Sequence, residues 1–182
     1  MKVVLAALSK FNPEIVKKTV HITHGMVKMS GGVKMSSRKG NIMRAVDVLD
    51  MASEAITKSG REPTEQIVQG AVKYAFLKSR LGGDIHFDID ESVSLEGNSG
   101  PYLQYAHARA RSIIVKSDTQ PLAPDELQSG ERLLSAKLAE YPGVVAKATE
   151  DLSPHIICTY LYELAQEFNR FYENNRVIGE PR

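Results

Sequence analysis

The residues best suited to chemistry form one short stretch, Lys34-Met35-Ser36-Ser37-Arg38-Lys39-Gly40. Small residues let a backbone approach phosphate oxygens closely, serine hydroxyls and free N–H groups donate to those oxygens, and flanking cations neutralise their charge. The composition therefore suits a loop that binds a triphosphate. It is equally compatible with a basic loop that binds nothing, and the P-loop pattern G-x-x-x-x-G-K-[ST] is absent from the sequence.

Charge is unevenly distributed around this stretch. Residues 1–44 contain nine basic residues and one acidic residue, Glu14, which gives +8; because the whole chain carries +1, the remaining residues carry −7. Such an asymmetry raises the local concentration of phosphates or polyanions at one end, although a solvated basic surface would look the same. With 42% hydrophobic and 25% charged residues, the chain has the composition of a folded protein. We expect a cytoplasmic protein without a membrane span.

Periodicity and turn residues predict the elements that position these groups. Alternation predicts a strand over 20–23, and Ser30-Gly31-Gly32 predicts a hairpin turn between segments 26–29 and 33–35. Helical spacing, with proline and glycine at the expected ends, predicts helices over the following ranges: 45–59, 63–80, 101–116, 124–140 and a last helix from 154 onward. The glycine-rich segment 97–100 is the expected hinge between a mixed part and an all-helical part.

Three other features have structural and functional interpretations. Alternation over 84–90 predicts a half-buried extended segment whose wet face carries Asp84, Asp88 and Asp90; a solvated strand face explains these carboxylates more simply than a metal site does. Cys158 lies in an apolar helical pattern and is interpreted as a buried, inert thiol. His21 and His24 are three residues apart on an expected strand, so they point to opposite faces and are assigned to structure.

The phosphate-binding candidate resembles the Lys-Met-Ser-Lys-Ser signature loop of class I aminoacyl-tRNA synthetases, in the Lys-Met-Ser-x-Arg-Lys-Gly form typical of arginyl-tRNA synthetases. Its surroundings resemble the same family in the same order. The matching segments are His21–Val27, Gly70–Ala75 and Glu96–Arg109, the last reading Glu-Gly-Asn-Ser-Gly-Pro-Tyr-Leu-Gln-Tyr-Ala-His-Ala-Arg. The other class I signature, His-Ile-Gly-His, is absent; His21-Ile22-Thr23-His24 only looks similar to it.

The resemblance implies a mostly α fold in two parts. Residues 1–97 are expected to be the C-terminal remnant of a Rossmann-like class I catalytic domain, and residues 98–182 a helical-bundle anticodon-binding domain that is incomplete. The implied activity is that of an arginine-tRNA ligase, which activates arginine with ATP and transfers it to tRNA(Arg). Because the first signature and the arginine pocket are missing, we expect the 182-residue chain alone to be inactive. We also expect exposed sheet edges to let it self-associate.

The resemblance also implies roles for the signature residues. Lys34 and Lys39 are the candidate catalytic residues, and the whole stretch from Lys34 through Met35, Ser36, Ser37, Arg38 and Lys39 to Gly40 is the candidate ATP-binding loop. ATP with Mg²⁺ would be a substrate, and no protein-bound metal is expected. The second signature lysine is Ser37 here, so its task must fall to Lys39, Arg38 or a residue outside this chain.

The helix that begins near residue 100 is the candidate tRNA-binding element. Its aromatic rings, amides and cations are groups that hold unstacked bases and phosphates. The candidates are Tyr102, Gln104, Tyr105, His107, Arg109 and Arg111. These six span most of a helix circumference, so some must pack in the core. The alternatives are a synthetase of the cysteine or methionine type and a stand-alone helical RNA-binding or scaffold module without catalysis.

Overall fold

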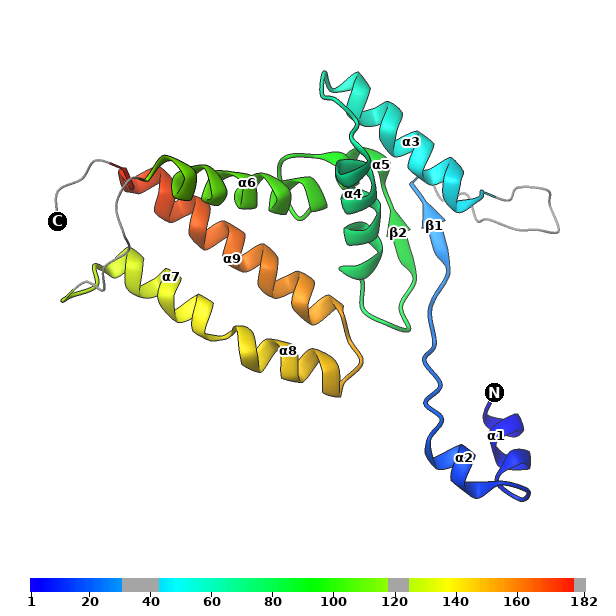
Figure 1. The fold of residues 1–182 in the computed structure, drawn as a ribbon. Helices are drawn as coiled ribbons and strands as arrows, with labels where there is room; N and C mark the ends of the chain where they lie inside the picture. Colours follow the sequence, from blue (N-terminus) through cyan, green and yellow to red (C-terminus); the bar gives the residue numbers. More distant parts are fainter. Residues whose placement is uncertain (31–42, 118–124, 179–182) are drawn as a thin grey trace.

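A computed structural model describes residues 1–30, 43–117 and 125–178. These residues are mostly helical, in agreement with the expected fold class, and they contain two short strands (Figure 1). The elements are α1 (Lys2–Leu8), α2 (Pro13–Lys17), β1 (Val27–Met29), α3 (Ala45–Lys58), α4 (Glu65–Leu77), β2 (Ile85–Phe87), α5 (Ile89–Val93), α6 (Gly100–Lys116), α7 (Ser129–Ala139), α8 (Tyr141–Glu150) and α9 (His155–Asn174). No helix in these ranges is long and apolar enough to cross a membrane.

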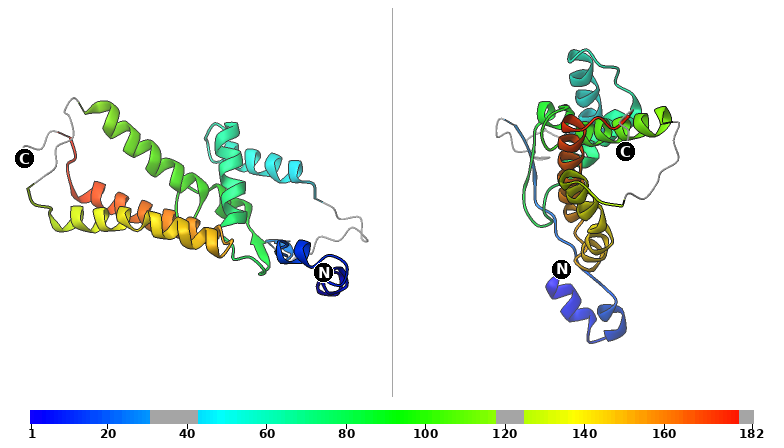
Figure 2. Two further views of the ribbon diagram at one scale, coloured as in Figure 1. Left: turned by 60° about the horizontal axis from the view of Figure 1, so that its bottom comes forward. Right: turned by 90° about the vertical axis from the view of Figure 1, so that its left-hand side faces the viewer.

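The first 22 residues form an arm that extends away from the rest of the molecule (Figures 1 and 2). Helices α1 and α2, which the sequence analysis did not predict, contact each other and bury no residue. The predicted strand over 20–23 is wrong, because this segment is irregular and exposed. Alternating residues form a strand only where another strand supplies hydrogen-bond partners, and none lies beside this segment in the described ranges.

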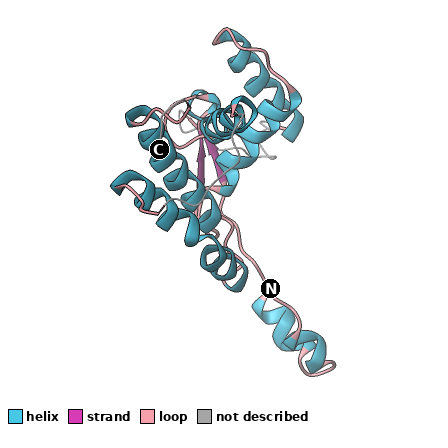
Figure 3. Cartoon of the chain, turned by 60° about the vertical axis from the view of Figure 1, so that its left-hand side comes forward, coloured by secondary structure: helices cyan, strands magenta, loops and turns pink. Residues whose placement is uncertain are grey.

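The two strands form a parallel pair (Figure 3), with Val27 opposite Ile85 and Met29 opposite Phe87. Strand β1 therefore pairs with a segment 58 residues further along the chain, and its predicted hairpin partner over 33–35 lies outside the described residues. Parallel pairs occur almost only in α/β sheets, where helices cover the faces. Phe87 is 1% exposed and packs with Val48 of α3 and Ala75 of α4.

The alternating segment 84–90 becomes helical after Phe87, which differs from the prediction. Asp88 caps α5, because its Oδ1 accepts a hydrogen bond of 2.9 Å from the backbone N–H of Glu91. This bond is the main cause of a lowered Asp88 pKa. Val93 of α5 then packs with Ile56 of α3 and Ala71 of α4 in a small core.

Within the predicted hinge at 97–100, Gly97 is exposed with open space around it, whereas Ser99 and Gly100 are buried. Gly100 meets Gly70 of α4 so closely that a Cβ on Gly100 would lie 2.5 Å from the Gly70 carbonyl oxygen. The Tyr74 hydroxyl of α4 lies 2.6 Å from Asn98 Oδ1 and 3.0 Å from the carbonyl oxygen of Cys158 in α9. Burial raises the Tyr74 pKa. These contacts pack α4 against the segment 98–100 and against α9.

The C-terminal half is a layer of helices in which α9 contacts α6, α7 and α8 (Figures 1 and 2). The predicted helix over 124–140 is shorter than expected, and the chain continues directly into α8, which was not predicted separately. Cys158 is buried as expected, and burial raises its pKa. The apolar face of α9 is only partly covered. An apolar groove of about 690 Å³ is lined by Leu103, Gln104, Ala106, His107, Ala110, Leu134, Leu138, Leu161, Leu164, Ala165 and Phe168.

Candidate nucleic-acid interface

The candidate ATP loop, Lys34 to Gly40, lies outside the described residues. Its catalytic and ATP-binding assignments therefore stay predictions. The described residues nearest to it in sequence are Ser30, which follows β1, and Met43 and Arg44, which precede α3. On the α3 side, Asp47 accepts hydrogen bonds from the backbone N–H and the guanidinium of Arg44, so the helix start is well capped.

The structure sorts the six candidate tRNA-binding residues of α6 into different environments. Tyr105 and Arg109, one turn apart, face α9. Tyr102 also lies against α9, where its hydroxyl accepts a 3.0 Å hydrogen bond from Asn169 Nδ2 and its ring packs against Tyr162. Gln104 is committed to α4, since its Nε2 donates to the Gln66 carbonyl oxygen at 2.9 Å. His107 and Arg111 are exposed on other faces.

Arg109 is the best-positioned cation of this group. Its Nη1 donates to Asn169 Oδ1 at 2.8 Å, and its Nη2 donates to the Tyr105 hydroxyl at 2.9 Å. Its Cζ lies 4.7 Å from the Tyr105 ring centroid and 4.6 Å from that of Tyr172, so cation–π contacts hold it from both sides. A guanidinium fixed in this way has lost most of its side-chain freedom before any ligand arrives.

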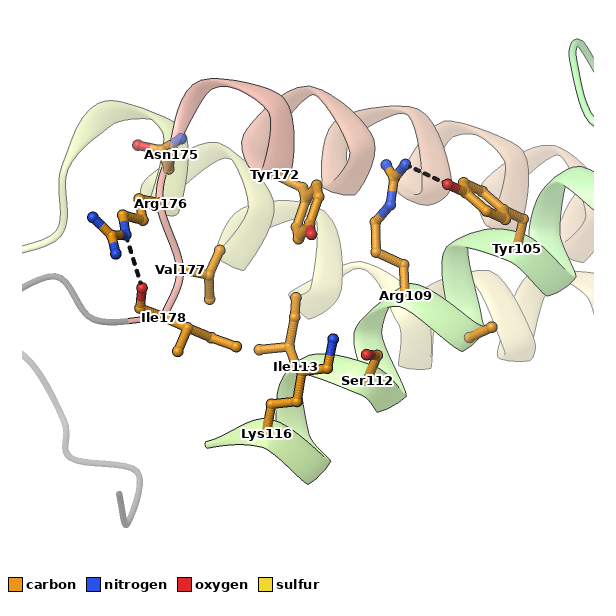
Figure 4. A pocket seen from close by; sticks show the side chains of 11 residues that line it. Tyr105, Arg109, Ser112, Ile113, Lys116, Tyr172, Asn175, Arg176, Val177 and Ile178 are labelled. Atoms are coloured by element: carbon orange, nitrogen blue, oxygen red, sulfur yellow. Dashed lines mark hydrogen bonds between the residues drawn. The ribbon is translucent and has the colours of Figure 1, made fainter. Parts of the chain in front are cut away.

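Arg109 stands at one wall of a pocket of about 590 Å³ between the C-terminal halves of α6 and α9 (Figure 4). The described residues that line the pocket include three cations and no carboxylate. They are Tyr105, Ala108, Arg109, Ser112, Ile113, Lys116, Tyr172, Asn175, Arg176, Val177 and Ile178. We call this site the polar pocket. Tyr105 and Tyr172 remain 47% and 39% exposed, so their rings are accessible to a planar ligand.

Sequence reasoning missed half of this pocket. Tyr172, Asn175 and Arg176 come from the end of α9 and the residues after it, and only Tyr105 and Arg109 had been singled out. A signal was present, however, because an aromatic ring, an amide and a cation follow one another within five residues.

A positive pocket with accessible tyrosine rings can hold an unstacked base on a ring face and a phosphate near its cations. Residues 103–182 match the family model of the DALR anticodon binding domain. All residues that line the polar pocket lie within this matched segment, so the pocket belongs to the part of the chain that is similar to an anticodon binding domain.

More of the chain has relatives than this domain alone. It is 36% identical over 177 residues to the arginine--tRNA ligase of Lactococcus lactis subsp. lactis, covering 88% of this chain and 31% of the relative. The corresponding enzyme of Mannheimia succiniciproducens is 37% identical over 176 residues, with 87% and 31% covered. The solved Thermus thermophilus arginyl-tRNA synthetase matches 98% of this chain and 31% of its own, with a TM-score of 0.78 and 31% identity.

These similarities confirm the resemblance to arginyl-tRNA synthetases that the signature motifs predicted. The chain spans 31% of the length of each of these relatives. The matches extend well beyond the anticodon-binding model toward the N-terminus.

Proposed function

We propose that this chain is part of an arginine-tRNA ligase, which activates arginine with ATP and transfers it to tRNA(Arg). The observation that carries the proposal is the polar pocket, because it sits in the segment that matches an anticodon binding domain and holds Arg109 ready between two tyrosines. A stand-alone RNA-binding module is less well supported, since the similarity to ligases includes residues outside that domain. We expect a cytoplasmic location, as stated above.

We further propose that residues 1–97 are the end of a Rossmann-like catalytic domain and that residues 98–182 are an incomplete anticodon-binding bundle. The parallel pair of β1 and β2 supports the first part, because two parallel strands alone make a poor sheet and fit the edge of a larger one. Self-association of the isolated chain through these strand edges belongs to the same proposal.

Catalysis is assigned to the signature loop. When the arginine carboxylate attacks the α-phosphorus of ATP, negative charge grows on the departing pyrophosphate. Lys34 and Lys39 would stabilise that charge, and the other loop residues would hold the phosphates, by electrostatics and positioning rather than by proton transfer. ATP enters with Mg²⁺ as a substrate.

The catalytic assignment is tested in a chimera in which this chain replaces the aligned segment of the Lactococcus lactis ligase. Lys34→Ala should lower the kcat of arginine-dependent ATP–pyrophosphate exchange about a hundredfold while KM for ATP changes little, because the cation acts in the transition state. The control is Lys147→Ala, because Lys147 is an exposed cation on α8 that pairs with Asp151. A variant Lys34→Ala that only raises KM for ATP would contradict the role.

The RNA assignment is tested on the chain itself, by fluorescence anisotropy with a labelled anticodon stem–loop of tRNA(Arg). Arg109→Ala should weaken binding about tenfold, since a charge-assisted contact and the support of both tyrosine rings are lost together. Lys147→Ala again serves as the control. Equal affinity of Arg109→Ala and the unmodified chain would exclude the polar pocket as the RNA site.

A further inference from the structure

One asparagine of α9 contacts two residues of α6, the candidate tRNA-binding helix. Asn169 Nδ2 donates to the Tyr102 hydroxyl at 3.0 Å, and Asn169 Oδ1 accepts a hydrogen bond from Arg109 Nη1 at 2.8 Å. Positions 102 and 109 are about two helical turns apart, so Tyr102 and Arg109 lie on the same face of α6. The two ends of a single amide therefore connect α9 to successive turns of α6.

These two contacts fix the orientation of the Asn169 amide. Arginine has donors only, so the amide oxygen must face Arg109 and the amide NH₂ group must face Tyr102. The Tyr102 ring is itself held against Tyr162, at a centroid distance of 5.7 Å. Asn169 is half-buried at this position. Its oxygen is consequently presented to Arg109 from a fixed place on α9.

The Arg109 guanidinium needs such a contact to keep one direction. The rings of Tyr105 and Tyr172 attract it, but a ring face sets no direction for the individual N–H groups of a cation. Hydrogen bonds set that direction. One goes to the hydroxyl of Tyr105, which is 47% exposed (Figure 4), and the other goes to the half-buried Asn169. A guanidinium has five N–H groups, so these two bonds leave others for a ligand.

We propose that Asn169 is a positioning residue that holds Arg109 in the orientation in which it binds RNA. This inference rests on the proposed binding of RNA at the polar pocket. A cation whose rotation is already fixed loses less side-chain entropy when it pairs with a phosphate or a base edge. Asn169 does not line the polar pocket, so it acts through Arg109 and not by touching a ligand there.

The first measurement is NMR of the 182-residue chain without RNA, in which the rotation of the Arg109 guanidinium is followed through its Nη protons. Asn169→Ala should make this rotation about fivefold faster, because one hydrogen bond that opposes it is lost. Asn174→Ala is the matched control. Asn174 is an exposed asparagine of the same helix that donates to the Arg170 carbonyl oxygen, and its removal should leave the rotation unchanged. Unchanged rotation in Asn169→Ala would overturn the proposal.

The second measurement is anisotropy with the labelled anticodon stem–loop of tRNA(Arg). Asn169→Ala should weaken binding about threefold, and Asn174→Ala should not weaken it. In a chain that already carries Arg109→Ala, Asn169→Ala should cause no further loss, because its effect passes through Arg109.

Two results would overturn the positioning role alone. One is unchanged RNA affinity in Asn169→Ala, and the other is an equal loss with and without Arg109, which would indicate a general structural role of Asn169 in α9. Absence of RNA binding by the unmodified chain would instead count against the proposed function, and the positioning role would fall with it.

Discussion

Two cavities beside α9 have similar volumes, but the side chains that line them differ in chemistry. The apolar groove, about 690 Å³, is lined mainly by leucine, alanine and phenylalanine, whereas the polar pocket, about 590 Å³, is lined by tyrosines and three cations. Helices α6 and α9 contribute to both sites; α7 completes the apolar groove, and the residues after α9 complete the polar pocket. Size therefore does not distinguish the two sites, and the chemistry of the lining is what favours the polar pocket for the proposed RNA contact.

The largest effect that separates the two sites is expected from Leu164→Ala in the apolar groove. Removing this partly buried side chain should lower the free energy of unfolding by about 2 kcal/mol, since buried contacts on α9 are lost. Urea unfolding measures this change. RNA affinity, measured where both proteins are folded, should not change; a tenfold loss would show that the groove also takes part in RNA binding.

The next effect is expected where α9 packs against α4, because α9 contributes residues to both sites. Tyr74→Phe removes a hydroxyl within hydrogen-bond distance of Asn98 and of the Cys158 carbonyl, and this should lower the free energy of unfolding by about 1–2 kcal/mol. The raised Tyr74 pKa means that the folded state favours the neutral phenol. Its contribution is complete below the unfolded-state pKa of about 10 and declines as pH rises above it.

Urea unfolding of the unmodified chain and of Tyr74→Phe at pH 8 and pH 10.5 checks this sign. The difference in stability between the two should shrink at the higher pH. A difference that grows with pH would mean that Tyr74 is not buried against Cys158 as described.

A smaller effect is expected from Lys116→Ala on the wall of the polar pocket. If Lys116 neutralises one phosphate, the slope of log K against log salt should become shallower by about 0.7, the value for one contact to a single strand. Affinity at moderate salt should fall about threefold. Anisotropy titrations at four salt concentrations measure the slope, and an unchanged slope would place the RNA backbone elsewhere.

The smallest effect is expected from Lys137→Ala, beside the apolar groove. Lys137 Nζ pairs with Glu140 at 2.8 Å and Glu163 at 2.6 Å, which joins α7 to α9. Both carboxylates are half-exposed, so the loss should be only about 0.5 kcal/mol in the free energy of unfolding. RNA affinity should stay the same, because this cation is committed to its two partners and lies outside the polar pocket.

Much of the fold was predictable because local sequence patterns specify where its helices begin and end. The helices over 45–59 and 101–116 were placed to within one residue at each end, since proline, glycine and apolar spacing mark them directly. The strand over 20–23 was predicted wrongly for the opposite reason. Extended structure depends on a partner, and the partner of β1 lies far along the chain in β2.

The residues of the candidate site also differ in whether the sequence could predict them. Arg109 and Tyr105 could be named from the sequence because they belong to one motif on one helix. Gln104, from the same motif, packs on α4 instead, and Tyr172 and Arg176 join the pocket from the far end of α9. Side chains on one helix take different roles according to which neighbouring helix covers each face.

The sequence by itself determined the resemblance to arginyl-tRNA synthetases, the signature loop and most of the helices, because motifs and helical periodicity are local in the chain. Only the tertiary structure decided that Arg109 lies between two tyrosines, that Ser30 is held by Asp88, and that Gly100 packs against Gly70 of α4. Each of these depends on contacts between residues distant in sequence. Burial and geometry set such contacts, and no local pattern encodes them.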